Sequence, residues 1–380
     1  MYLSNKIFTL IVAVISIQIT AQDLNKINLN TNLNPLKQSI YGWIQTQQLP
    51  NGLIKNTDNS NNSSLYNNAL AAILFSSQHD FKKTEAIFDY FNKQLKKEFL
   101  KNKGGFSQMR NLNGELNHRT WMGDNAWLLI AINTYHHQAK NQKYKHLATE
   151  LEKWLRSLQD KDGGLWGGFE ANGQHIPKNT EGMLDAFHAV RGFDDFHQHI
   201  LQFFKIHRWN ATEQFLTTTE ENHKYAVALD LHSWTYCILA DFPKSTLTDA
   251  SKFLSTQTIS HSKNSITGFC FDVDNDCVWL EGTGQMVVAY QKANMKKEAL
   301  FYLNEMSKTI IESATNTKLK GLPYVANNAT NFGRENIWKS ADAEPSISGS
   351  VWYLWGVLNY NPFEIDFKTA IPPNDKFWLK

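Results

Sequence analysis

The sequence predicts an all-α fold, an (α/α)6 toroid in which six helical hairpins close into a double ring. Six strongly apolar segments recur about every 50 to 60 residues, and an amphipathic segment with one charged face precedes each of them. An amphipathic helix must bury its apolar stripe, and an apolar helix must be covered on all sides. Both needs are met when the six apolar helices form an inner ring and the six amphipathic helices surround it.

The predicted inner helices have small or apolar residues on nearly all faces, and they span 64–75, 123–135, 180–190, 228–240, 281–293 and 344–358. The predicted outer helices alternate with them, at 33–48, 81–99, 142–158, 195–207, 244–257 and 295–313. Loops rich in Gly, Asn and Asp lie between them and indicate tight turns and short β-hairpins. No Pro/Ser-rich linker interrupts residues 30–365, so we expect residues 22–380 to form a single domain.

The N-terminus has the layout of a secretory signal peptide. Lys6 precedes an apolar run from Ile7 to Ile19, and Ala21 offers a small residue for cleavage. The apolar run is too short to span a bilayer comfortably. We therefore expect residues 1–21 to be removed near Ala21, and the mature protein to be secreted or periplasmic without a membrane anchor.

Charge and motifs exclude several classes of function. The chain has 38 basic and 36 acidic residues and a net charge of only +2, without a basic stripe, so nucleic acid is not expected as a partner. It contains no phosphate-binding loop, dinucleotide fingerprint or Gly-x-Ser-x-Gly motif. No cofactor is therefore expected.

The cysteines and the acidic loop beside them give no clear ligand set. Cys270 and Cys277 are close enough in sequence to form a disulfide, but spacing alone leaves this open, and Cys237 lies in an apolar run typical of a buried thiol. The intervening "FDVDND" has the rhythm of a calcium loop, yet Cys277 and Thr283 stand where an EF-hand needs glycine and glutamate. The histidine pairs have no matching ligands nearby, so we expect no metal site.

Carboxylates mark the starts of the predicted inner helices. Because these helices run parallel, their N-terminal ends surround one funnel. Helix capping and the helix dipole explain any one acid there, but they explain less well why five of six entrances carry one. The residues at the entrances are Tyr66, Asp124, Glu181, Asp230, Glu281, and the pair Asp342 and Glu344.

Aromatic residues accompany these acids, and together they favour a carbohydrate ligand. Sugar rings stack on aromatic faces while carboxylates bind their hydroxyls, and two carboxyl groups supply the acid and base of glycoside hydrolysis. Gly282 and Gly284 would leave room for a bulky ligand. We expect Asp124 and Glu281 to be the catalytic pair, with Glu181 and Glu344 as the second choice. The expected substrate contacts are Tyr66, Trp121, Trp127, Asp230, His232, Trp279 and Trp338.

Several phrases resemble bacterial members of the six-hairpin glycosidase superfamily. They are "GDNAWL", "NTEGMLDA", "WLEGTGQ" and "SGSVWYLWGVLNYNPF", at or near the starts of four predicted inner helices. The resemblance covers nearly the whole mature chain, but it lies in the architecture and fits no single family. It implies a carbohydrate-active enzyme, in many relatives an inverting hydrolase with its acid and base at inner-helix starts.

Three other functions remain open on the same ring. A polysaccharide lyase or sugar epimerase would use a set such as Tyr66, His118, Arg119 and His232. A terpene-cyclase-like double ring is suggested by "LQDKDGGLWGG", although the motif occurs once and with altered spacing. A noncatalytic glycan-binding protein would keep the ring without a competent acid pair.

Overall fold

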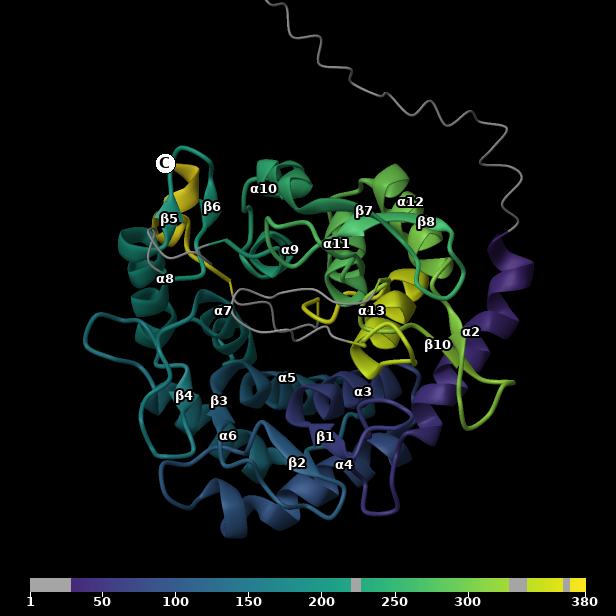
Figure 1. Cartoon of the computed structure of the whole chain (residues 1–380). Helices are drawn as coiled ribbons and strands as arrows, with labels where there is room; N and C mark the ends of the chain where they lie inside the picture. The colour runs from purple at the N-terminus through teal and green to yellow at the C-terminus, as the bar shows by residue number, and fades with distance from the viewer. Residues whose placement is uncertain (1–28, 220–226, 328–339, 365–369) are drawn as a thin grey trace, which may run out of the picture.

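A computed structural model describes residues 29–219, 227–327, 340–364 and 370–380 (Figure 1). The predicted signal peptide and Trp338 lie outside these residues. The described part contains twelve α-helices, a few short 3-10 and π turns, and only two-stranded sheets. Among the described residues, no helix combines the length and the apolar character that a membrane span requires.

Six buried helices form the inner ring, and their apolar residues face neighbours on all sides. They are α3 (Leu65–Ser77), α5 (Met122–Ala139), α7 (Thr180–Ala189), α9 (Asp230–Ile238), α11 (Leu280–Lys292) and α13 (Ile347–Leu358). Each packs against the next, and α13 packs against α3, so the ring closes. The predicted inner segments are thus confirmed, with ends that differ by a few residues.

The outer helices cover this ring, as Figure 1 shows. They are α2 (Leu29–Thr46), α4 (Phe81–Gln94), α6 (Lys145–Ser157), α8 (Asp195–His207), α10 (Ser245–Asp249) and α12 (Lys296–Ser307). A π-helical turn, η1 (Leu95–Phe99), extends α4. Each outer helix packs on an inner one through its apolar stripe, for example α4 on α3 and α2 on α13.

Two predicted outer helices are shorter than expected. The segment 244–257 begins as α10, continues as the 3-10 turn η2 (Ala250–Phe253), and then enters strand β7 (Leu254–Thr258), which pairs with β8 (Ser265–Phe269). The segment 295–313 leaves the helix after Ser307 and forms β9 (Ile311–Glu312), which pairs with β10 (Lys320–Gly321). In both cases strand pairing in a long connection overrides the helical pattern.

The remaining strands join the loops at the mouth of the ring. Strand β1 (Asn62–Ser64) pairs with β2 (Met109–Asn111), and β3 (Thr120–Trp121) pairs with β4 (Gly168–Phe169). A third pair, β5 (Trp209–Asn210) and β6 (Phe215–Leu216), forms a hairpin after α8. The first two pairs each tie the loop of one hairpin to the loop of the next, which fixes the entrances of α3 and α5.

The seam between the first and last hairpins is closed by loop contacts as well as by helix packing. Thr57 and Ser346 form an antiparallel bridge, and the Glu344 carboxylate accepts hydrogen bonds from the Thr57 hydroxyl at 2.7 Å and from the backbone and side-chain nitrogens of Asn59 at 2.9 Å. Glu344 therefore ties the two ends of the ring together.

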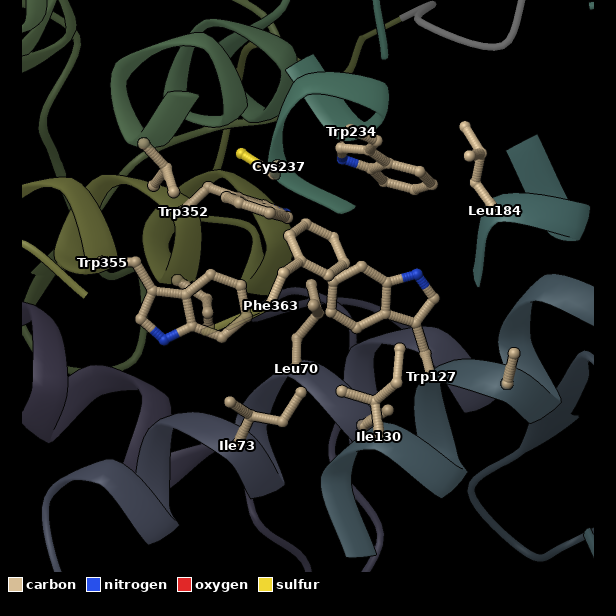
Figure 2. Close-up of a cluster of buried hydrophobic side chains, with 14 of the residues drawn as sticks. Leu70, Ile73, Trp127, Ile130, Leu184, Trp234, Cys237, Trp352, Trp355 and Phe363 are labelled. Carbon is tan, nitrogen blue, oxygen red and sulfur yellow. The ribbon is translucent and has the colours of Figure 1, made fainter. Parts of the chain in front are cut away.

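Aromatic side chains fill the middle of the ring (Figure 2). Phe363, which follows α13, inserts between the inner helices, with its ring centroid 5.3 Å from that of Trp127 and 5.2 Å from that of His188. Trp127 also contacts Trp234 and Trp352, at 5.7 and 6.1 Å. The ring is thus filled from the C-terminal ends of the inner helices, and open space lies toward their N-termini.

Candidate active site

A cavity of about 170 Å³ lies at the N-terminal ends of the inner helices. Five carboxylates line it, from four helices that are far apart in the sequence, and aromatic rings form most of the remaining wall. The lining residues are Tyr66, Gln108, Trp121, Gly123, Asp124, Trp127, Glu181, Asp185, Asp230, Trp234, Phe271, Trp279, Glu281 and Gln285. The convergence predicted from the ring is therefore observed for four of the entrance acids.

These acids lie in the first turns of their helices, but other residues occupy the N-cap positions. Trp121 precedes α5, Asn179 caps α7 by accepting a hydrogen bond from the Gly182 amide, and Trp279 precedes α11. Asp124, Glu181 and Glu281 follow those caps by two or three positions. Their side chains point to the cavity rim and floor rather than serving as N-caps.

Glu281 is held by one donor from α3 and one from its own helix, α11. The Tyr66 hydroxyl donates a 2.6 Å hydrogen bond to Glu281 Oε1, and the Gln285 amide approaches the same oxygen at 3.4 Å. Trp352 in turn donates to the Tyr66 hydroxyl at 3.1 Å. Burial raises the pKa of Glu281, whereas the hydrogen bond from Tyr66 opposes this rise by stabilising the carboxylate.

Asp124 lies on α5, on the opposite side of the ring from α11, and it is less well supplied with donors. Burial raises the pKa of Asp124 to about 7. The positive charge of Arg119 opposes this rise, and the negative charge of Glu281 adds to it. A carboxyl group with such a pKa retains a proton over much of the neutral range.

Glu181, Asp185 and Asp230 form a second acidic group on the adjacent helices α7 and α9. Burial raises the pKa of each, and the neighbouring carboxylates raise the pKa values of Glu181 and Asp185 further. Asp185 is only 1% exposed, and Gly123 lies beside it, so that a Cβ at position 123 would fall 2.9 Å from Asp185 Oδ2. The crowding of these buried carboxyl groups favours their protonated forms.

Asp185 is the main site residue that sequence reasoning missed. It follows Glu181 by four residues, which places both on one face of α7. A carboxylate inside an otherwise apolar helix, one turn after an entrance acid, was the signal that could have identified it. Gln108, Trp234, Phe271 and Gln285 also line the cavity without having been predicted as site residues.

Aromatic side chains supply the apolar walls. Trp121, Trp127 and Trp279 line the cavity as expected, and Phe271 packs on Trp279 with ring centroids 5.1 Å apart. Tyr66 contacts Trp127 edge to face at 5.4 Å. Trp121 is only partly buried and also carries the Arg119 guanidinium 5.1 Å from its ring, so it stands at the rim.

Two predicted site residues lie apart from the cavity. Glu344 belongs to the seam described above and does not line the cavity. His232 points between α9 and α10, where its Nδ1 lies 2.9 Å from the Thr246 carbonyl oxygen, and burial lowers the pKa of its imidazole to about 3. The sixth ring entrance therefore contributes no carboxylate, since α13 begins with Ser346 as its cap.

The residues of the expected lyase or epimerase set are not brought together. Of Tyr66, His118, Arg119 and His232, only Tyr66 lines the cavity. His118 lines a separate surface hollow between the loops around 101–107 and 169–173. Arg119 instead binds Glu170 at 3.2 Å and the Gln108 side chain. No histidine of the described residues lines the cavity.

Gly282 and Gly284 make room for protein side chains, which corrects the expectation that they leave space for a ligand. A Cβ at position 282 would fall 2.1 Å from the Trp279 ring, and one at position 284 would fall 2.7 Å from the Trp352 side chain. The two glycines therefore allow the aromatic wall to pack directly on α11.

Several polar atoms of the lining residues have no protein partner. Within the described part of the chain, Asp185 Oδ1, Asp230 Oδ1 and Trp234 Nε1 make no hydrogen bond. Buried polar atoms in proteins are nearly always satisfied, and exceptions are common at functional sites. A ligand rich in hydroxyl groups would donate hydrogen bonds to the carboxylate oxygens and accept one from the indole N–H.

No protein-family profile matches the sequence, and no curated protein matches it. Solved structures do match its fold. One is a cellobiose 2-epimerase from Spirochaeta thermophila, with 14% identity, a TM-score of 0.61, and coverage of 90% of this chain and 98% of the other. Another is an alpha-amylase from Clostridium perfringens, with 11% identity, a TM-score of 0.61, and coverage of 86% and 97%. A third is a glycosidase variant in complex with glucose, with 11% identity, a TM-score of 0.60, and coverage of 90% and 100%.

These similarities span nearly the whole of each chain, and at such low identity they show the fold. The predicted (α/α)6 toroid is confirmed at that level.

Proposed function

We propose that this protein is a secreted glycoside hydrolase that cleaves an oligo- or polysaccharide with Asp124 and Glu281 as general acid and general base. The observation that carries this proposal is the pair of carboxyl groups at opposite entrances of one Trp-walled cavity, of which only Glu281 accepts a hydrogen bond from a tyrosine among the described residues. The solved structures with the same fold include a glycosidase in complex with glucose, which supports a sugar as the ligand.

The roles follow from the surroundings of the two acids. Asp124, with its pKa raised to about 7, can protonate the leaving oxygen of a glycosidic bond. Glu281 receives the Tyr66 hydrogen bond, which favours its ionised form, so it suits the activation of water. Since α5 and α11 lie across the ring from each other, we infer an inverting mechanism, in which a water molecule must fit between base and sugar.

The acidic group on α7 and α9 suits substrate binding. Glu181, Asp185 and Asp230 present carboxyl oxygens that can accept or share protons with sugar hydroxyls, and Trp121 and Trp279 offer flat apolar faces to the sugar ring. Glu181 is the second candidate for the acid, because burial and the surrounding carboxylates raise its pKa as well.

An epimerase is the second candidate function, because two of the solved structures with this fold are a cellobiose 2-epimerase and a sugar epimerase from a ruminal bacterium. Epimerisation needs a base that removes a proton next to a carbonyl carbon and a group that returns it. The cavity of the described residues offers carboxylates for this and no imidazole. We favour hydrolysis for that reason.

Product mass separates the two functions. We would incubate the purified protein with a panel of oligosaccharides and analyse the products by mass spectrometry and NMR. Hydrolysis adds one water per cleaved bond, and NMR at early times should find the anomer opposite to that of the substrate. Products of unchanged mass but altered ring configuration would identify an epimerase instead. Glu281→Gln should abolish turnover, while Glu344→Gln, at the seam, should retain it.

Secretion is proposed from the N-terminal pattern. Expression of the full chain in a Gram-negative host, followed by fractionation and N-terminal sequencing, should yield a periplasmic or extracellular protein beginning near Gln22. A cell-associated protein with an intact N-terminus would contradict this part of the proposal and leave the enzymatic part standing.

A further inference from the structure

The loop between β8 and α11 gathers two sulfur and three carboxylate ligands in eight residues. Cys270 and Cys277 begin and end this stretch, and both are buried, at 2% and 0% exposure. Their sulfur atoms lie 3.7 Å apart, too far for a disulfide bond. Asp272, Asp274 and Asp276 lie between them in the sequence.

All three carboxylates approach the same sulfur. Cys270 Sγ lies 3.6 Å from Asp274 Oδ1, 3.8 Å from Asp276 Oδ1 and 4.0 Å from Asp272 Oδ1. Two overlapping groups result, in each of which the ligand atoms are within 4.8 Å of one another: Cys270, Asp276 and Cys277, and Cys270, Asp272 and Asp274. Cys270 belongs to both groups.

These separations are those of ligands around one small cation. Zn–S bonds of about 2.3 Å at a tetrahedral angle place two sulfurs about 3.8 Å apart, and a Zn–O bond of about 2.0 Å places an oxygen about 3.5 Å from a sulfur. In the group of Cys270, Asp276 and Cys277, the sulfur–sulfur distance of 3.7 Å and the 3.8 Å distance from Cys270 Sγ to Asp276 Oδ1 are close to these values.

The charges around Cys270 also favour a cation. Within the described residues, neither Asp272 nor Asp274 forms an ion pair with a lysine or arginine, whereas the chain has many such pairs elsewhere. Carboxylates brought together around a buried sulfur repel one another, and the buried Asp272 also loses hydration. A divalent cation would remove both penalties, and a disulfide would remove neither.

We propose that this loop binds a divalent cation of the Zn²⁺ class, with Cys270, Cys277 and Asp276, the group that holds both thiols, as its protein ligands. Two thiolates favour a thiophilic metal over Ca²⁺, which prefers oxygen ligands only.

Such a site would hold one wall of the cavity in place. Phe271 directly follows Cys270, and its carbonyl oxygen accepts the Leu229 amide from the entrance of α9 at 2.9 Å. Trp279 follows Cys277 by two residues and packs on Phe271. The cation would therefore fix the two aromatic residues that stand beside Glu281, without touching the substrate.

The test uses the full mature protein, purified without chelators, and three matched cysteine variants. We expect about one zinc per chain by elemental analysis, and a thiolate-to-metal charge-transfer band in the near ultraviolet after exchange with Co²⁺. Cys270→Ser and Cys277→Ser should lose this band, and Cys237→Ser, which removes a buried thiol elsewhere, should keep it. Asp276→Asn should weaken Co²⁺ binding by about 10-fold or more.

Two results would overturn the proposal. The first is an intact mass two hydrogens lower than that of the thiol form, with a peptide linking Cys270 to Cys277 and no bound metal. The second is Co²⁺ or Zn²⁺ binding that Cys270→Ser and Asp276→Asn leave unchanged. Circular dichroism of each variant shows whether it is folded. If a cysteine variant does not fold, Asp276→Asn still tests whether the loop binds the metal. None of these readouts depends on hydrolytic activity.

Discussion

Tyr66 at the start of α3 donates a 2.6 Å hydrogen bond to Glu281 at the start of α11, which joins two residues 215 positions apart in the sequence at the mouth of the ring. The sequence placed both at ring entrances, but it contained nothing that paired them. This contact distinguishes Glu281 from the other cavity acids, because no other carboxylate there receives a phenolic donor in the described part of the chain. It leads to the first prediction.

Tyr66→Phe should move the acid limb of the pH–rate profile to higher pH. The hydrogen bond stabilises the Glu281 carboxylate and so lowers its pKa, and its loss raises that pKa. A base that must be ionised then becomes active only at higher pH. A hydrogen bond to a charged group contributes about 1.5 to 3 kcal/mol, so the limb should move by about one to two pH units.

The control for this prediction is Tyr135→Phe. Tyr135 on α5 donates an equally short 2.6 Å hydrogen bond to Glu85 on α4, and neither residue lines the cavity. This variant should lose similar stability and leave the pH profile unchanged. Identical profiles for Tyr66→Phe and the wild type would mean that Glu281 is not the base.

Asp124→Asn should discriminate between substrates by their leaving groups. The loss of a general acid slows cleavage by about 10²- to 10⁴-fold when the leaving oxygen needs a proton. An aryl glycoside with an acidic phenol as leaving group needs little protonation and should lose less than about tenfold. Glu281→Gln should be equally slow on both, because the base acts on water. If Asp124→Asn slows the cleavage of both substrates equally, another residue must be the general acid, and Glu181 would be the next candidate.

Asp185→Asn should stabilise the protein, and the gain should grow with pH. The folded-state pKa of Asp185 lies well above the unfolded value of about 3.9 because the side chain is buried among other acids. The stability that its protonation contributes is complete below about pH 4 and declines as the pH rises toward the folded pKa. The amide needs no proton, so the variant should gain at least about 1 kcal/mol over the wild type at pH 8.

Denaturant titrations at pH 5 and pH 8 measure this difference. Asp195→Asn is the control, since Asp195 is exposed in the first turn of α8 and should give nearly the same small change at both pH values. The stability difference between Asp185→Asn and the wild type should therefore be larger at pH 8 than at pH 5. An equal difference at both pH values would contradict the raised pKa of Asp185.

Trp121→Ala should raise KM about tenfold and change kcat much less. Trp121 is partly exposed at the rim of the cavity, where its ring can stack on a sugar. Trp166→Ala serves as a control, because Trp166 stacks on His175 at 4.7 Å and does not line the cavity. Isothermal calorimetry with an inactive Glu281→Gln background measures binding directly. Unchanged affinity in the Trp121 variant would exclude stacking at this position.

The fold could be predicted from the sequence because it depends on a repeated pattern. The inner helices are apolar on all faces and the outer helices on one, and the same fold occurs in a solved structure with only 14% sequence identity. The pattern failed where strand pairing competes with helix formation, in β7 after α10 and β9 after α12. Such pairing depends on segments that meet only in the folded chain.

The site was predicted only in part, for a similar reason. Asp124, Glu181, Asp230 and Glu281 were identified because each lies at a helix start that the repeat locates. Glu344 matched the same rule but bonds to the loop at Thr57 and Asn59, which local sequence does not reveal. Asp185 was not predicted because it lies a full turn into its helix and not at the helix start.

The seam between Glu344 and Thr57 joins residues 287 positions apart, so the ring cannot close before the segment that leads into α13 has been made. Every residue of the cavity has been synthesised once the chain reaches Gln285, yet α13, which seals the ring against α3, is made more than 60 residues later. Until then, the apolar flanks of α3 and α11 have no partner, and closure at such high contact order is slow. A nascent or truncated chain therefore carries the full set of acids without a cavity, and its open ring is a surface for chaperones or for aggregation.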